Sequence, residues 1–211
     1  MQKYPVIVAL DGLSLSESLA VARVLKDHVW GYKVHELVMR EGFGVIKKLK
    51  RFGKVFVDLK LHDIPHTVGL ETDALVKYGA DLISVHASGG REMLEAAVKA
   101  GGRRVVAITV LTSLPAQEAR KAPGLASLAR AAGVTNIVCS PQELGSLRRL
   151  SKTVTLITPG IRRGSKLYDQ KRTMPPLQAL ALGADLLVIG RPITESSDHA
   201  AALATLFSPS S

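Results

Sequence analysis

The chain has 211 residues and a formal net charge of +10, and 46% of its residues are hydrophobic but only 4% are aromatic. This is enough material for one domain with a large aliphatic core, and no apolar stretch approaches the roughly 18 residues that a membrane-spanning helix needs. The single cysteine, Cys139, cannot form an internal disulfide bond, and the N-terminus leads directly into a strand-like run without room for a signal peptide, so we expect a cytoplasmic protein.

Strand-like and helical segments alternate along the chain. Short apolar runs of the kind found in buried strands lie at Val6–Leu10, Gly31–His35, Val55–Lys60, Leu82–His86, Val105–Val110, Asn136–Ser140, Val154–Thr158 and Leu186–Gly190. Segments with helical periodicity lie at Ser16–Asp27, Val38–Lys50, Thr67–Tyr78, Glu92–Ala100 and Leu177–Leu182.

This alternation predicts the fold. Eight strands with intervening helices, at about 25 residues per unit, predict a single-domain α/β protein, a (β/α)8 TIM barrel over residues 1–211 with a loose tail at residues 208–211. An open, doubly wound sheet is the alternative. It is disfavoured because no glycine-rich dinucleotide turn follows the first strand.

The most informative segment runs from Val57 to Pro65, at the end of the third predicted strand. Side chains in a strand alternate between its two faces, so Asp58 and Lys60 are expected to project in the same direction. Charges at the end of a buried strand are costly unless they are paired, which leaves either a structural ion pair or a working site. Asp63 adds a third charge just before the proline that ends the strand, and this favours a site.

Polar side chains also follow the ends of the other predicted strands. In a (β/α)8 barrel, these C-terminal ends meet at one rim, where active sites are found. The residues that the sequence places there are Asp11, Lys33, Asp58, Lys60, His86, Thr112, Ser113, Arg162 and Arg191. The sequence therefore predicts one active site at this rim.

The motif Asp58-Leu59-Lys60-Leu61-His62-Asp63-Ile64-Pro65-His66-Thr67 resembles the signature of the orotidine 5′-monophosphate decarboxylase family. The resemblance continues at Val8-Ala9-Leu10-Asp11, Val85-His86-Ala87-Ser88-Gly89-Gly90, Leu111-Thr112-Ser113, Thr158-Pro159-Gly160-Ile161-Arg162, Asp169-Gln170 and Val188-Ile189-Gly190-Arg191-Pro192-Ile193-Thr194. It implies a (β/α)8 enzyme that converts orotidine 5′-monophosphate to uridine 5′-monophosphate and CO₂ in pyrimidine nucleotide synthesis, with no metal and no organic cofactor.

The resemblance also implies catalytic roles. Lys60 matches the family's proton donor, which stabilises negative charge at C6 of the pyrimidine and then protonates that carbon. Asp58 would lie against the substrate carboxylate, and Lys33 and Asp63 would complete an alternating Lys–Asp–Lys–Asp network.

Binding roles follow from the same resemblance. Asp11 and Lys33 would contact the ribose hydroxyls, Ser113 would hydrogen-bond to the pyrimidine, and Pro159 would pack near the base. The residues implied for the phosphate are Arg162, Gln170, Gly190 and Arg191, with Gln170 on a loop that folds over it.

Three further residues imply a partner. In the family, the residues that match Asp63, Ile64 and Thr67 reach into the active site of the neighbouring subunit. We therefore expect a homodimer with two shared active sites, which binds a small-molecule substrate.

One departure from the family pattern concerns the second strand. The family usually carries glycine two residues after the lysine of this strand, and this chain has His35. The histidine either affects the local backbone and the placement of Lys33, or is a neutral substitution that points away from the barrel interior.

Three other functions are disfavoured. A zinc site at His62 and His66 is interrupted by Pro65, so the two rings need not share a helix face. Related sugar-phosphate decarboxylases and aldolases share the Asp-x-Lys-x-x-Asp pattern and bind Mg²⁺, but they carry a carboxylate near the position of Lys33, where an ammonium repels a cation. A basic module that binds nucleic acid fits the net charge but lacks zinc-finger spacing, an aromatic RNA-binding signature and a basic tail. We expect no metal, no nucleic acid and no membrane partner.

Overall fold

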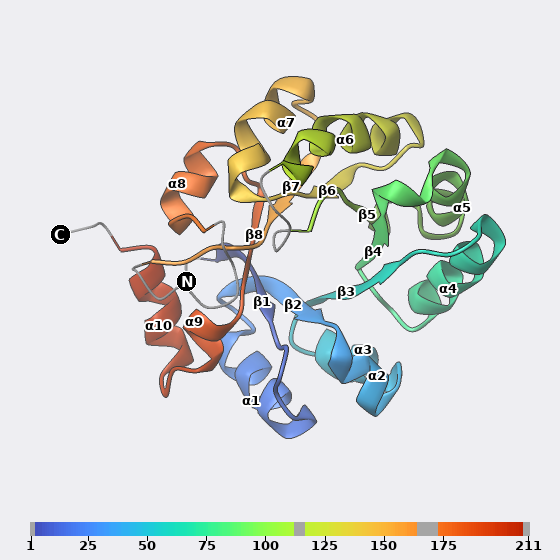
Figure 1. Ribbon diagram of the computed structural model, residues 1–211. Coiled ribbons are helices and arrows are strands. Elements are labelled where there is room, and N and C mark those ends of the chain that lie inside the picture. The colour runs from blue at the N-terminus through green and yellow to red at the C-terminus, as the bar shows by residue number, and fades with distance from the viewer. Residues whose placement is uncertain (1–2, 112–116, 164–172, 209–211) are drawn as a thin grey trace.

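The computed structural model describes residues 3–111, 117–163 and 173–208, and its strands form a closed parallel barrel (Figure 1). The strands are β1 (Tyr4–Ala9), β2 (Val29–Val34), β3 (Lys54–Leu61), β4 (Leu82–His86), β5 (Val105–Ile108), β6 (Asn136–Val138), β7 (Thr155–Thr158) and β8 (Leu186–Ile189). Each strand pairs with the next in the sequence, and β8 pairs with β1. The predicted (β/α)8 barrel is confirmed, and the alternative of an open sheet is wrong because the sheet closes on itself.

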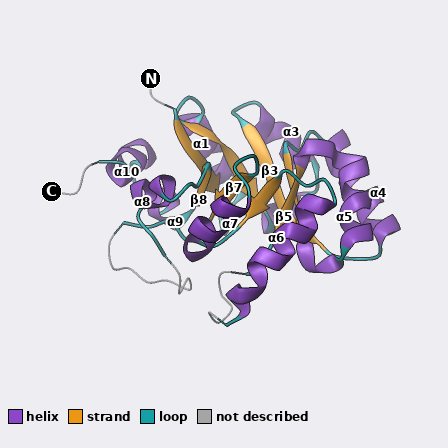
Figure 2. Cartoon of the chain, turned by 90° about the horizontal axis from the view of Figure 1, so that it is seen from above, coloured by secondary structure: helices purple, strands orange, loops and turns teal. Residues whose placement is uncertain are grey.

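Helices surround the barrel (Figures 1 and 2). They are α1 (Leu15–Leu25), α2 (Glu36–Glu41), α3 (Gly44–Lys50), α4 (Pro65–Lys77), α5 (Arg91–Gly101), α6 (Ala122–Ala131), α7 (Leu144–Leu150), α8 (Pro176–Ala181), α9 (Arg191–Thr194) and α10 (His199–Leu206). Short 3₁₀ turns lie at Ala87–Gly89, Gly102–Arg104, Glu118–Lys121 and Pro141–Glu143. Within the described ranges, no helix is both long and apolar enough to cross a membrane.

The single helix predicted at Val38–Lys50 is wrong. Two helices, α2 and α3, occupy this segment, and they are separated at Gly42. Gly42 has φ of 70°, a left-handed conformation that glycine adopts without steric cost. The break leaves α2 as a separate short helix that begins after the end of β2 and the one intervening residue, His35.

Two apolar layers hold the barrel together. Ile7 on β1 packs with Phe56 and Val106 from other strands in a cluster made only of strand side chains, which fills the barrel interior. Val6 and Val8 point the other way and join the larger core between the strands and the helices. This alternation is the expected period of a strand, and the filled interior leaves the open end of the barrel for a site.

Two repeated turns fix the register of neighbouring strands. In Gly79-Ala80-Asp81, the carboxylate of Asp81 accepts a hydrogen bond from the amide of Val55 at 2.7 Å. In Gly183-Ala184-Asp185, the carboxylate of Asp185 accepts from the amide of Leu156 at the same distance. Gly79 and Gly183, the first residues of these turns, both have positive φ. The turns therefore align β3 with β4 and β7 with β8, the strands that carry most of the predicted site.

Candidate active site

A cavity of about 480 Å³ opens at the C-terminal end of the barrel strands. This volume lies within the range of small-molecule sites. The predicted site residues that line it are Asp11, Lys33, Asp58, Lys60, Pro159, Arg162, Gly190 and Arg191. Apolar side chains such as Phe56, Ile108 and Val188 line it too. The rim predicted from strand ends is therefore the wall of one cavity.

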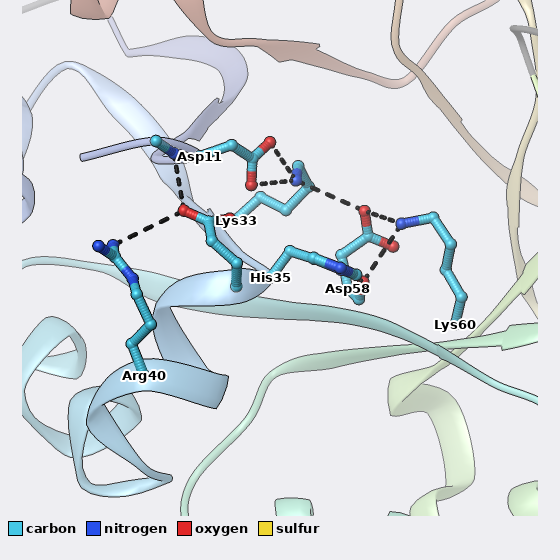
Figure 3. Close-up of polar contacts among 8 residues, drawn as sticks. Asp11, Lys33, His35, Arg40, Asp58 and Lys60 are labelled. Carbon is cyan, nitrogen blue, oxygen red and sulfur yellow. Dashed lines mark hydrogen bonds and ion pairs between the residues drawn. The ribbon is translucent and has the colours of Figure 1, made fainter. Parts of the chain in front are cut away.

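Four charged side chains form a continuous series of ion pairs beside this cavity (Figure 3). The ammonium nitrogen of Lys33 lies 2.9 and 2.7 Å from the two carboxylate oxygens of Asp11 and 3.5 Å from Oδ2 of Asp58. Oδ2 of Asp58 also accepts a hydrogen bond from Nζ of Lys60 at 2.9 Å. The order is therefore Asp11–Lys33–Asp58–Lys60, and it joins three of the four predicted catalytic residues.

The centre of this series is buried. The side chains of Lys33 and Asp58 are 10% and 11% exposed. Burial lowers the pKa of Lys33, but the carboxylates of Asp58 and Asp11 more than offset this effect, so the pKa of Lys33 lies above its ordinary value. Lys33 is therefore a fixed positive charge at neutral pH.

Asp58 has one oxygen in an unusual environment. Its Oδ1 is buried and accepts no hydrogen bond within the described part of the chain. A buried acceptor without a partner costs about 1–3 kcal/mol, and such atoms are uncommon in folded proteins. An unsatisfied carboxylate oxygen beside a cavity marks Asp58 as a candidate functional group.

Lys60 reaches Asp58 through an irregularity in β3. The pairing of β3 with β4 shifts register between Val57 and Leu61, and Lys60 has φ of 55°, a left-handed conformation that is uncommon for residues other than glycine. Its backbone amide donates a hydrogen bond to Oγ of Ser84 on β4 at 2.8 Å. Asp58 and Lys60 line the same cavity, as predicted. Regular strand alternation alone does not place them there, because a bulge-like distortion of β3 lies between them.

Two guanidinium groups line another part of the cavity. Arg162 follows β7 and is buried, and its amide donates to the carbonyl of Met174 at 2.9 Å. Arg191 follows β8, directly after Gly190. A Cβ atom at Gly190 would lie 3.3 Å from the Cβ of Ala9, so glycine keeps this corner open. Two arginines on the loops after β7 and β8 suit a phosphate group.

Three predicted residues lie apart from the cavity. Asp63, Ile64 and Thr67 follow β3 and do not line it. Asp63 is exposed and accepts a hydrogen bond from the amide of Ile64 at 2.7 Å, and the side chain of Ile64 is 64% exposed. Asp63 therefore does not join the ion pairs within one described chain. Ser113, Gln170 and residues 209–211 of the tail predicted at 208–211 lie outside the described residues.

The first turn of α2 contacts the site from outside the cavity (Figure 3). Nδ1 of His35 lies 2.6 Å from the backbone oxygen of Asp58. The neighbouring Glu36 accepts a hydrogen bond from the amide of Gly12 at 2.7 Å, next to Asp11. His35 therefore contacts the backbone of the strand that carries Asp58, but it does not line the cavity. The departure from the family's usual glycine drew attention to His35, but no local sequence pattern indicated that it would contact the backbone of Asp58.

The histidines near the rim do not form a metal site. His86 packs against His62, with ring centroids 5.3 Å apart. Burial, His62 and Lys60 lower the pKa of His86. In the ranges that the structure describes, no group of three His, Cys, Asp or Glu side chains is arranged to hold a metal ion, so His62, Asp63 and His66 make no such cluster.

Known proteins resemble the chain over almost its whole length. The profile of the Orotidine 5'-phosphate decarboxylase / HUMPS family matches residues 4–206. The curated orotidine 5'-phosphate decarboxylase of Sphingopyxis alaskensis is 40% identical over 209 residues, covering 92% of this chain and 93% of that protein. The corresponding protein of Thermobifida fusca is 43% identical over 220 residues, covering 96% and 94%.

Solved structures agree with these relatives. The crystal structure of orotidine 5'-phosphate decarboxylase from Lactobacillus acidophilus is 34% identical, has a TM-score of 0.78, and is matched over 96% of both chains. An uncharacterized conserved protein from Geobacillus kaustophilus is 33% identical, with a TM-score of 0.80 over 96% of this chain and 98% of that one.

Proposed function

The chain belongs to the orotidine 5'-phosphate decarboxylase / HUMPS family, and we infer from this membership and from its cavity that it converts orotidine 5′-monophosphate to uridine 5′-monophosphate and CO₂. The observation that carries the inference is the series Asp11–Lys33–Asp58–Lys60 beside a cavity that two arginines also line. One chain thus supplies an ammonium for the reacting carbon and guanidinium groups for the phosphate.

The reaction poses an electrostatic problem. When CO₂ leaves C6 of the pyrimidine, an electron pair stays on an sp² carbon that has no adjacent electron sink. Only interactions that are stronger in the transition state than in the bound substrate accelerate this step. Fixed charges at the developing carbanion supply such interactions, because they need not reorganise during the reaction.

Lys60 is the proposed proton donor. Its ammonium lines the cavity and is held 2.9 Å from Oδ2 of Asp58. It stabilises the negative charge that develops at C6 and transfers a proton to that carbon, and the resulting amine recovers a proton from water. Asp58 orients the ammonium and lies against the substrate carboxylate. Lys33 extends the alternating charges toward Asp11, and Asp63 of a second subunit completes them.

The remaining lining residues are proposed to bind the nucleotide. Asp11 and Lys33 contact the ribose hydroxyls, Ser113 hydrogen-bonds to the pyrimidine, and Pro159 packs near the base. The residues proposed for the phosphate are Arg162, Gln170, Gly190 and Arg191. The support for this assignment is that Arg162 and Arg191, on two adjacent loops, line the same cavity as Lys60.

The direct test follows the loss of ultraviolet absorbance as orotidine 5′-monophosphate is consumed, with EDTA present. Lys60→Ala should lose about 10³-fold or more in turnover, since it removes both the acid and its charge. Lys54→Ala is the matched control, because Lys54 is exposed at the opposite end of the same strand and should leave turnover unchanged. Absence of turnover by folded wild-type protein would refute the function, and an active Lys60→Ala protein would refute the role of Lys60.

EDTA separates this function from that of Mg²⁺-dependent sugar-phosphate relatives. The ammonium of Lys33 lies between the carboxylates of Asp11 and Asp58 and repels a divalent cation from both. We therefore expect full turnover in EDTA. Turnover that disappears with EDTA and returns with Mg²⁺ would favour the metal-dependent chemistry.

A homodimer with shared active sites is part of the proposal. It is supported by Asp63 and Ile64, which are exposed at the barrel rim but lie outside their own cavity, and by the exposed Leu70 on α4. Covering the exposed apolar side chains of Ile64 and Leu70 with a partner would remove them from water, which favours association. Asp63 of one subunit would then complete the ion-pair series of the other.

Mixing two inactive variants tests this sharing. In a dimer of one Lys60→Ala and one Asp63→Ala subunit, one of the two sites has both residues intact. Random assembly should therefore restore about a quarter of the wild-type sites. A mixture that stays inactive after the subunits are unfolded and refolded together, or an active monomer, would contradict the shared site.

We also propose that the chain works as a single domain in the cytoplasm. The support is its one cysteine, Cys139, a buried free thiol, which suits a reducing compartment.

A further inference from the structure

A short hydrogen bond joins α2 to the backbone of the active-site strand. Nδ1 of His35 lies 2.6 Å from the carbonyl oxygen of Asp58. A carbonyl oxygen only accepts, so His35 is the donor and its imidazole carries a proton on Nδ1. The same oxygen lies 3.3 Å from Nζ of Lys60. His35 and the ammonium of Lys60 therefore share one acceptor.

That carbonyl lies at the start of the distorted part of β3. The register with β4 shifts between Val57 and Leu61, and Lys60 has left-handed φ. A residue in this conformation persists only when its surroundings hold it there. Ser84 accepts a hydrogen bond from the Lys60 amide on one side, and His35 binds the Asp58 carbonyl on the other.

His35 makes this contact without entering the cavity. It is absent from the cavity lining and lies half-buried at the N-terminal end of α2, and Figure 3 shows its ring nitrogen beside the backbone of Asp58. The next residue, Glu36, accepts from the amide of Gly12, which follows Asp11. The first turn of α2 thus touches the backbone beside both carboxylates that bind Lys33.

We propose that His35 is a positioning residue for the decarboxylation: by holding the Asp58 carbonyl it fixes the distorted strand and keeps the ammonium of Lys60 on the Asp58 carboxylate, facing the cavity. Without His35, the carbonyl keeps Lys60 as a donor, and the ammonium is drawn from the carboxylate toward the backbone. The proposal rests on the roles of Asp58 and Lys60 proposed above. A small displacement of a reacting group lowers the rate even when substrate binding is unchanged.

Two nearly isosteric substitutions isolate the hydrogen bond. The amide nitrogen of asparagine occupies the place of Nδ1 and donates in the same direction, whereas leucine puts a methyl group there. His35→Leu should lower kcat by about 10- to 100-fold. His35→Asn should stay within about threefold of the wild type, and KM should change by less than about threefold in both proteins, because the ribose and phosphate contacts are elsewhere.

The binding of uridine 5′-monophosphate provides the second measurement. Its dissociation constant should be the same in all three proteins, because the product contacts the site residues but has no carboxylate to lose. A structural defect would weaken product binding and kcat together. The positioning role is overturned if His35→Leu keeps wild-type kcat, if His35→Asn and His35→Leu fall equally, or if KM rises while kcat does not change.

Two controls complete the test. If His35→Leu fails to fold, His35→Gln replaces it, because its amide donor lies one bond further from the backbone, and its kcat should fall in the same way. Lys60→Ala, assayed in parallel, separates the two proposals. An active Lys60→Ala protein would refute the proposed role of Lys60. An inactive Lys60→Ala protein together with a fully active His35→Leu protein would refute only the proposed role of His35.

Discussion

Gly31 is the position where a single methyl group should do the most damage. It lies on β2 opposite Lys54 of β3. A Cβ atom there would lie 2.2 Å from the carbonyl oxygen of Lys54 and 2.8 Å from its carbonyl carbon. Ordinary contacts between nonbonded heavy atoms are about 3.5 Å. Because the obstacle is backbone, the two strands must separate by about 1 Å.

The expected loss in the free energy of unfolding for Gly31→Ala is about 2–4 kcal/mol. Overpacking contributes about 1–3 kcal/mol, and each strand hydrogen bond that is stretched or broken adds about 1 kcal/mol. For a chain of this length, 1 kcal/mol shifts Tm by about 2–4 °C, so Tm should fall by about 5–15 °C. Lys33 lies two residues further along β2, so kcat/KM should fall as well.

Urea unfolding at one fixed protein concentration measures this change. Gly124→Ala is the matched control: it adds the same methyl group on α6, where a Cβ atom meets nothing within 4 Å. Its helix propensity should leave stability unchanged or raise it by up to about 1 kcal/mol. The steric reasoning is refuted if Gly31→Ala is as stable as the wild type, or if both variants lose the same free energy.

Three further predictions concern single side chains. Arg162→Met should raise KM by about 10- to 100-fold, since a hydrogen bond to a charged group contributes about 1.5–3 kcal/mol. The control is Arg163→Met, because Arg163 is exposed and donates to the Thr205 carbonyl, and this variant should keep the wild-type KM. Equal KM values for the two variants would contradict the assignment of Arg162 to the phosphate. Burial, His62 and Lys60 lower the pKa of His86, so its contribution to stability is complete above about pH 6.5 and is lost as the pH falls toward the lowered pKa. Between pH 7.5 and about pH 5.5, the free energy of unfolding of His86→Asn should therefore fall less than that of the wild type. Parallel plots of the free energy of unfolding against pH for the two proteins would contradict this prediction. Burial, followed by Glu143, raises the pKa of Cys139 to about 12, so iodoacetamide at about pH 8 should label only the unfolded protein, and rapid labelling of the native protein would show that the thiol is accessible.

The sequence alone was sufficient for the fold and for the rim at which the cavity lies. β4 has the predicted bounds Leu82–His86, and the other strands lie within a few residues of their predicted ranges. Short apolar runs indicate strands, and glycine and aspartate indicate turns, so a few neighbouring residues are enough to predict each element. Because parallel strands end at one rim, Asp11, Lys60 and Arg162 could be assigned to one site before any contact was known.

Other features were decided only by tertiary structure. The helical periodicity of Val38–Lys50 does not reveal the break at Gly42, and the strand pattern of Val55–Lys60 does not reveal the left-handed backbone of Lys60. Both the bond from the Lys60 amide to Ser84 and the bond from His35 to Asp58 join residues more than 20 positions apart in the sequence. Local periodicity specifies which segments become strands. The distances among Lys33, Asp58 and Lys60 arise only when β2, β3 and β4 pair side by side, because each of these side chains is held by backbone atoms from a distant part of the chain.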